Sequence, residues 1–230
     1  MYFDPQLNFK YHVNTVNKKL AQMLYFKKKT KNVLTKIAMK FLYYSTIHCN
    51  IIYAIHVWSC TAESNLKPLL LKQKIAVCIL NNSAYNAHTE PLFKACEILP
   101  LNFLCEYFKV QFMQKFTQGY LPPSFNDIWV TNAIRRADQD QVELRNADDI
   151  YIPFARLSST VRQPLTEFPR LWASFPDEQL KFTRNVIEFN KNLKIHYLNR
   201  LSATPVCNRL LCPHCHLNAN RLNDVSLDSI

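Results

Sequence analysis

The chain has 230 residues, a formal net charge of +11 and 48 % hydrophobic residues, but a single glycine, Gly119. Its length is that of one or two domains, and its apolar content can fill a packed core, which argues against global disorder. Phosphate-cradling loops need glycine, because glycine alone reaches positive φ at little cost. The composition therefore excludes Rossmann and P-loop nucleotide-binding folds.

The net charge is concentrated in the first 80 residues. They contain twelve Lys and no Arg against two carboxylates, Asp4 and Glu63, whereas the other 150 residues hold 16 basic and 15 acidic side chains. No carboxylate occurs from Pro5 to Ala62. A field of one sign over one part of a chain indicates a polyanionic partner, either nucleic acid or an anionic membrane.

Hydrophobic residues recur at spacings of three and four along most of the chain, which predicts a mainly α fold. The predicted helical segments are 12–28, 32–46 with its apolar continuation 47–58, 64–80, 100–116 and 177–199, and a short helix starting near Thr89. Gly119 would end the helix over 100–116. Residues 121–175 contain proline and arginine with weak periodicity, so we expect an extended connector there, with a short alternating run at Ile150–Ile152.

The stretch Phe41–Cys60 carries no charge over 20 residues, which is the length of a membrane span. Polar groups are costly in lipid, and the polar side chains of this stretch include Ser45, Thr46, His48, Asn50 and His56. A buried pair of core helices is therefore the favoured interpretation, and a membrane partner is not favoured. The alternative is a basic membrane-associated protein anchored by residues 41–60, with the flanking lysines on the cytoplasmic side.

The opening residues, MYFDPQLNFKYH, lack the apolar core of a secretory signal peptide. An intracellular protein, nuclear or cytoplasmic, is therefore expected. In that reducing setting, cysteines scattered among apolar residues are expected to be small core side chains rather than disulfides. These cysteines are Cys49, Cys60, Cys78, Cys96 and Cys105.

The densest basic run is Lys27-Lys28-Lys29-Thr30-Lys31, which is also similar to a nuclear-import tag. Lysines on a helix surface neutralise phosphates and release counterions. A merely solvated Lys-rich face usually has interspersed Glu, and this region has none, so nucleic-acid binding is favoured. The lysines expected to contact phosphates are Lys18, Lys19, Lys27, Lys28, Lys29, Lys31, Lys36 and Lys40.

A cluster near the C-terminus is the best candidate metal site. Cys212 and Cys215 have the Cys-x-x-Cys spacing that supplies two zinc ligands from one turn, and Pro213 favours a knuckle over a helix. The predicted Zn²⁺ ligands are Cys207, Cys212, Cys215 and His216, with His214 or His196 as alternatives for the fourth. A second Cys-x-x-Cys is missing, so a plain tail with free thiols is the competing interpretation.

Short landmarks follow one another along essentially the whole chain. They are Phe3-Asp4, Leu7–Phe9, His12-Val13, Asn17–Leu20, Tyr53–Trp58, Leu71–Cys78, His88–Phe93, Ile98–Leu101, Arg170–Trp172 and Val206–His216. Their order and spacing resemble the region that follows the catalytic palm in the reverse transcriptases of non-LTR retrotransposons of the jockey-like, LINE type. Three positions depart from the family pattern, because Ala54 and Ser59 stand where glycines are common and Cys78 replaces a basic residue. These departures suggest a decayed copy.

The resemblance implies a fragment of a transposable-element RNA-directed DNA polymerase, comprising the thumb and C-terminal region without fingers or palm. Residues 1–120 would be a basic helical thumb-like region, 121–175 a connector, and 176–230 a C-terminal helix with a small Cys-rich tail forming a zinc knuckle. In the family the thumb grips the template–primer duplex. The implied partners are therefore RNA, DNA or an RNA–DNA hybrid.

Catalysis is not expected from this fragment alone, because the palm carboxylates that bind Mg²⁺ would precede Met1. Reverse transcriptases bind two divalent metals with an aromatic-Ala-Asp-Asp tetrad. Asp148-Asp149 follow Asn146-Ala147 instead, and lie after the thumb-like region, in the wrong order for that role. A polar turn before Ile150 is the expected structure, and no residue shows the spacing of a nucleophile elbow or catalytic triad.

The zinc prediction is tested by elemental analysis of the purified protein. We expect about one Zn per chain in the wild type, and loss of that metal in Cys212→Ser, because three remaining ligands bind Zn²⁺ weakly. Equal and near-zero metal in both proteins would instead identify the cluster as a plain tail.

Overall fold

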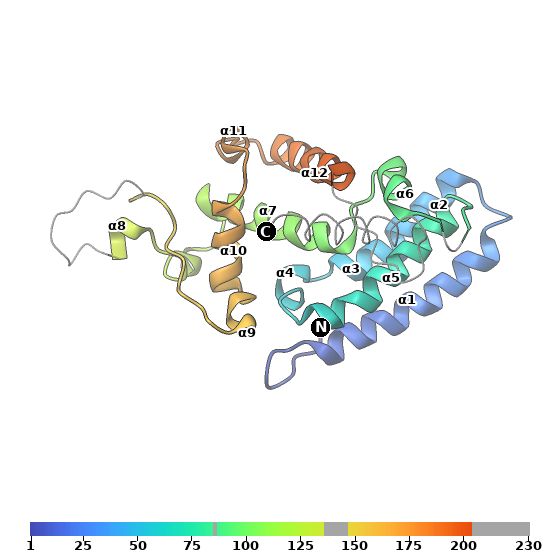
Figure 1. Cartoon of the computed structure of the whole chain (residues 1–230), viewed down its shortest axis with the longest axis horizontal. Helices are drawn as coiled ribbons and strands as arrows, with labels where there is room; N and C mark the ends of the chain where they lie inside the picture. The colour runs from blue at the N-terminus through green and yellow to red at the C-terminus, as the bar shows by residue number, and fades with distance from the viewer. Residues whose placement is uncertain (85–86, 136–146, 204–230) are drawn as a thin grey trace, which may run out of the picture. The chain divides into compact units, whose positions relative to one another are not determined.

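The computed structural model describes residues 1–84, 87–135 and 147–203 (Figure 1). Helices dominate this part of the chain, which confirms the predicted mainly α fold. Within the same residues, the β pairing consists of an isolated bridge between Thr131 and Ile150. The short alternating run at Ile150–Ile152 therefore makes a bridge rather than a strand.

The helices follow one another with short connections. In chain order they are α1 (Lys10–Thr30), α2 (Lys36–Leu42), the π-helix η1 (Tyr43–His48), α3 (Cys49–Ile52), α4 (Ile55–Trp58), α5 (Glu63–Leu80), α6 (Thr89–Cys96), α7 (Leu101–Thr117), the 3₁₀ helix η2 (Pro123–Phe125), α8 (Asn132–Arg135), α9 (Ser158–Val161), α10 (Pro164–Ala173), α11 (Glu178–Lys181) and α12 (Val186–Ala203). The predicted 12–28, 64–80 and 100–116 correspond to α1, α5 and α7. The predicted single helix over 177–199 is wrong, because α11 ends before Asn185. The Asn185 side chain then accepts hydrogen bonds from the N–H groups of Ile187 and Glu188 and starts α12.

The chain divides into two compact units. Unit 1 comprises Met1–Val13, Ala54–Leu66 and Asn102–Lys194. Unit 2 comprises Asn14–Tyr53, Lys67–Leu101 and the described residues from Ile195 on. Both units are built from segments distant in sequence, and the predicted boundaries at 120 and 175 do not coincide with this division.

Unit 2 is built around an apolar stripe on α1. Val16, Leu20 and Leu24 recur every four residues and are all buried. Removing such side chains from water stabilises a fold by about 1.5–3 kcal/mol each. Other buried residues of the unit come from η1, α3, α5 and α6 and include Tyr43, Ile47, Ile51, Leu69, Val77 and Phe93.

The uncharged stretch Phe41–Cys60 is not one continuous helix. It runs through the end of α2, η1 and α3, turns at Tyr53 and Ala54, and resumes as α4. Ala54 interrupts it with the left-handed φ of +52°. Within the described ranges, no helix has both the length and the apolar character required to cross a membrane.

Unit 1 contains an aromatic core between α7 and α10, and this overturns part of the connector prediction. Phe168 is buried and stacks on Trp129 with ring centroids 6.1 Å apart. Lys109 of α7 is buried and forms an ion pair with Glu167 of α10 at 2.7 Å. The extended conformation expected for 121–175 is therefore wrong for Pro164–Ala173. Two prolines, Pro164 at the helix start and Pro169 inside it, obscured the helical pattern.

Left-handed backbone is imposed on several residues that are not glycine. Gly119 has φ +71° and ends α7 as predicted. Among the described residues, Leu7, Phe9, Ala54, Asn82 and Glu97 also have positive φ. The left-handed region costs a residue with a Cβ atom about 1–2 kcal/mol.

We predict that Ala54→Gly raises the free energy of unfolding by about 1 kcal/mol, because glycine removes the clash of Cβ at positive φ. Urea denaturation measures the change. The matched control is Ala21→Gly on the exposed side of α1, which should lower stability by about 1 kcal/mol. A loss of stability in both variants would contradict the strain at Ala54.

Candidate nucleic-acid interface

The basic residues predicted to bind phosphates all belong to unit 2. Because the stripe of Val16, Leu20 and Leu24 is buried, the opposite side of α1 faces solvent. That side carries Lys18 and Lys29, which are separated by about 16 Å along the helix axis. The predicted lysines that the structure places at the surface are the exposed Lys18, Lys19, Lys28, Lys29 and Lys36 and the partly exposed Lys31 and Lys40. These seven residues are called the lysine surface below.

Unit 2 carries almost uncompensated positive charge. Its described residues include two carboxylates, Glu90 and Glu97. Its basic residues are Lys18, Lys19, Lys27, Lys28, Lys29, Lys31, Lys36, Lys40, Lys67, Lys72, Lys74, Lys94 and Arg200. In unit 1, carboxylates accompany basic residues throughout. The asymmetry of charge seen in the sequence is therefore a property of unit 2. Tertiary structure adds the exposed Lys67, Lys94 and Arg200 to this unit, and the sequence alone did not single them out.

Lys27 does not belong to the lysine surface, although it lies in the densest basic run. Its side chain is fully buried, and its Nζ donates a hydrogen bond to the Met39 carbonyl at 3.4 Å. The same nitrogen lies 5.1 Å from the centroid of the Tyr43 ring. Burial lowers the pKa of the Lys27 ammonium group to about 8. The expected phosphate contact is therefore wrong for this residue.

The spacing along α1 explains why Lys27 is inside. Lys27 follows Leu24 by three residues and Leu20 by seven, which places it on the buried stripe. The run of four lysines suggested a charged surface, whereas the helical period assigns Lys27 to the opposite side from Lys18. The sequence thus contained the signal for its burial.

Tyr43, the aromatic partner of Lys27, is fixed by a polar contact in the core of unit 2. The Gln73 amide donates to Tyr43 Oη at 3.0 Å and to the Leu99 carbonyl at 2.9 Å. Burial raises the pKa of Tyr43 well above its usual value, so its hydroxyl stays protonated. These bonds join η1, α5 and the residues before α7, and they hold the ring against which Lys27 packs.

The turn between α1 and α2 is closed by a helix cap. Thr35 Oγ1 accepts a hydrogen bond from the N–H of Ala38 at 3.3 Å, which starts α2. Lys36 and Lys40 then lie on successive turns of α2. Capping therefore positions the second group of exposed cations.

The other candidate sites do not gather into a catalytic or metal-binding arrangement in the described ranges. Asp148 and Asp149 are exposed in a turn, as predicted. Among the residues that the structure describes, no group of three or more His, Cys, Asp or Glu side chains could hold a metal ion. The predicted zinc ligands Cys207, Cys212, Cys215 and His216 lie outside the described residues.

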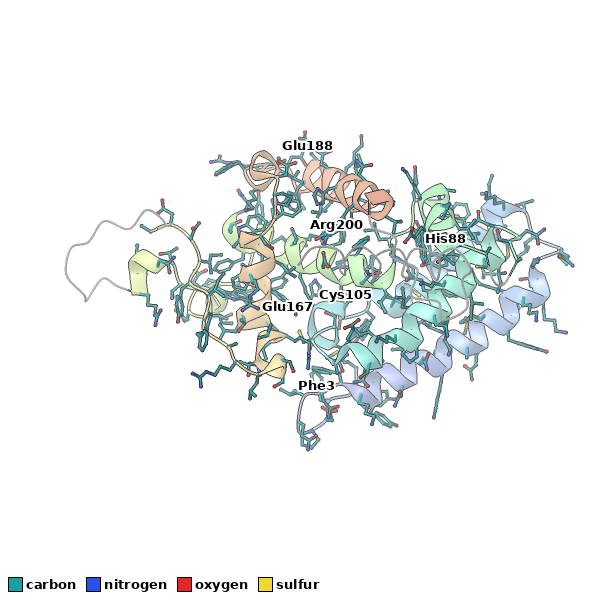
Figure 2. All side chains as sticks on the ribbon, viewed as in Figure 1. Phe3, His88, Cys105, Glu167, Glu188 and Arg200 are labelled. Carbon is teal, nitrogen blue, oxygen red and sulfur yellow. The ribbon has the colours of Figure 1, made fainter. Side chains whose placement is uncertain are left out.

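The scattered cysteines are free thiols, and most fit the prediction that they are core side chains. Cys78, Cys96 and Cys105 are buried, whereas Cys49 is exposed. Burial raises the pKa of Cys60 to about 11 and that of Cys105 to about 12, so both stay protonated at neutral pH. Figure 2 labels Cys105 on α7 and Glu167 on α10, and both residues belong to unit 1. Neither Cys60 nor Cys105 is therefore an activated nucleophile.

Comparison with known proteins gives no match: no family model, curated protein or solved structure is similar to this chain. What unit 2 binds is therefore inferred from its own charge, burial and contacts.

The buried ammonium of Lys27 predicts a pH-dependent stability. Its folded pKa of about 8 lies below the value of about 10.4 for an unfolded chain, so between these values the unfolded chain binds more protons. The free energy of unfolding should therefore rise as pH increases from 8 to 10 relative to Lys27→Met, which lacks this group. At pH 7 Lys27→Met should be more stable than wild type by about 2 kcal/mol.

Urea titrations at pH 7, 9 and 10 measure both effects. The Met39 carbonyl also accepts the Tyr43 N–H, so the substitution leaves it paired. Lys28→Met, at the exposed neighbouring position, is the control and should follow the wild-type pH profile within about 0.5 kcal/mol. Parallel profiles for wild type and Lys27→Met would show that Lys27 is not desolvated.

Proposed function

We propose that the chain binds nucleic acid through the lysine surface of unit 2, as the thumb-like part of a non-LTR retrotransposon reverse transcriptase. The observation that carries the proposal is the concentration of exposed cations in a unit whose described residues include two carboxylates. Such a surface neutralises phosphates and gains affinity by releasing condensed counterions.

Among the residues that the structure describes, the lysines of this surface form no ion pair. Lys109 forms an ion pair with Glu167 at 2.7 Å, and the His88 imidazole lies 3.9 Å from the Glu90 carboxylate. Neither includes a member of the lysine surface. These cations are therefore available to an external anion.

Helix stabilisation explains only part of this pattern. Lys28 and Lys29 lie in the last turn of α1, where cations are favourable. Lys36, however, is the first residue of α2, and a cation at a helix N-terminus is unfavourable by about 0.3–1 kcal/mol. Helix stability does not explain a cation at this position, which supports a role in binding.

The order of landmarks supports the narrower assignment to an RNA-directed DNA polymerase of a transposable element. The proposed role is binding of RNA, DNA or their hybrid, and not polymerisation, because these 230 residues contain no palm-type carboxylate motif. The membrane-anchor alternative is not pursued, because Tyr43, Ile47 and Ile51 of the uncharged stretch are buried in unit 2.

Affinity for an RNA–DNA hybrid, measured by fluorescence anisotropy at increasing salt, tests the proposal. Four phosphate contacts predict a slope of about −3.6 for log K against log salt concentration on a duplex. Replacing Lys18, Lys28 and Lys29 together by Gln should reduce the steepness by about 2 to 3 and weaken binding at low salt at least tenfold.

The control carries the same change of charge in unit 1. Arg170, Arg184 and Lys191 are exposed there, and their joint replacement by Gln should leave the slope unchanged within about 0.5. Absence of binding at low salt, a flat slope or an equal loss in the control would contradict the proposal.

A further inference from the structure

Exposed aromatic side chains lie among the lysines of unit 2. Tyr25 is 67 % exposed on α1, and Phe41 is 72 % exposed on α2. Between them in sequence, Phe26, Val33 and Ile37 are exposed as well. Single exposed apolar residues are ordinary on protein surfaces, but a group of them within a basic, acid-free segment marks a binding site.

The side of α1 opposite the buried stripe carries one aromatic residue, Tyr25, among polar ones. Lys18, Gln22, Tyr25 and Lys29 are spaced by four, three and four residues and are all exposed, so they form one row. The Lys29 Nζ lies 5.7 Å from the centroid of the Tyr25 ring. A planar group resting on this ring would therefore have an ammonium group beside it.

The arrangement is similar on α2. Phe41 follows Ile37 by four residues, so both lie on one side of this helix. Lys36 and Lys40 directly precede them in sequence. In sequence, a lysine thus directly precedes each exposed apolar residue of α2.

We infer that unit 2 binds unpaired nucleic acid, with bases stacked on Tyr25 and Phe41 while the lysine surface contacts the phosphates. The inference rests on the proposed function and specifies its ligand. Bases within a duplex are stacked on one another and offer no free face, whereas an unpaired base stacks on any exposed aromatic ring. Phosphate contacts alone would need no aromatic residues in this segment.

Other occupants fit these observations less well. A second copy of the chain would bring like charges together. A helix lying in an anionic bilayer presents its apolar face to the lipid, whereas α1 buries its apolar stripe of Val16, Leu20 and Leu24 inside unit 2. The exposed row of α1 is polar apart from Tyr25.

Three oligonucleotides separate base stacking from phosphate binding: a dT strand of about 20 nucleotides, an abasic strand of the same length and a duplex of the same length. The wild type should bind the dT strand at least about fivefold more tightly than the abasic strand at equal salt. Tyr25→Ala and Phe41→Ala should each weaken dT binding about fivefold or more, with an unchanged salt slope and unchanged affinity for the abasic strand.

Two further variants control for unfolding and for aromatic character. Tyr25→Phe keeps the ring and should keep wild-type affinity within about twofold. Phe154→Ala removes a ring that is 83 % exposed in unit 1 and should have no effect.

The outcomes are distinct. Equal affinity for the dT and abasic strands, with no effect of Tyr25→Ala and a steep salt slope retained, would overturn the stacking inference and leave the proposed function standing. Failure to bind any of the three oligonucleotides would overturn both. Binding to phosphatidylserine vesicles that is lost in Tyr25→Ala, without nucleic-acid binding, would also overturn both and assign the surface to lipid.

Discussion

The burial of Lys27 against Tyr43 constrains how α1 is rotated in unit 2, and the remaining features of the lysine surface depend on this rotation. With Lys27 on the inner side beside Leu20 and Leu24, Lys18 and Lys29 necessarily face solvent. Tyr43 is itself held by the Gln73 amide, which also binds the Leu99 carbonyl. A buried polar network of this kind favours one register of packing, because any rotation of α1 would leave an ammonium group without its partners.

The two units handle charge differently. In unit 1 a buried cation is neutralised internally, since Lys109 and Glu167 approach to 2.7 Å. Among the described residues of unit 2, carboxylates that could pair with the exposed cations are few. The mutual repulsion of these cations opposes folding. An external polyanion would relieve that repulsion. The same segment exposes aromatic rings, which a stacked base would cover, so the proposed phosphate binding and base stacking would together explain both unusual properties of this surface.

The sequence predicted the long helices well and the short or proline-containing ones poorly. Regular apolar spacing identified α1, α5 and α7, whereas Pro164 and Pro169 concealed α10, and the π-helix η1 has a period that a 3.6-residue pattern does not represent. Most of the lysine surface was evident from charge alone. Lys27 was wrongly predicted to be a surface residue, because the local density of charge was given more weight than the helical spacing. Lys67 belongs to unit 2 through tertiary structure, which proximity in the sequence does not reveal.

The central claim is that the exposed lysines of unit 2 contact nucleic acid while Lys27 is buried. Lysine-selective acetylation tests this claim most directly when it is measured by mass spectrometry with and without an oligonucleotide. The account predicts that nucleic acid protects Lys18, Lys28 and Lys29 but not the exposed Lys191 of unit 1, and that Lys27 reacts only after unfolding. Equal protection of Lys191, or acetylation of Lys27 as fast as that of Lys28 in the folded protein, would contradict it.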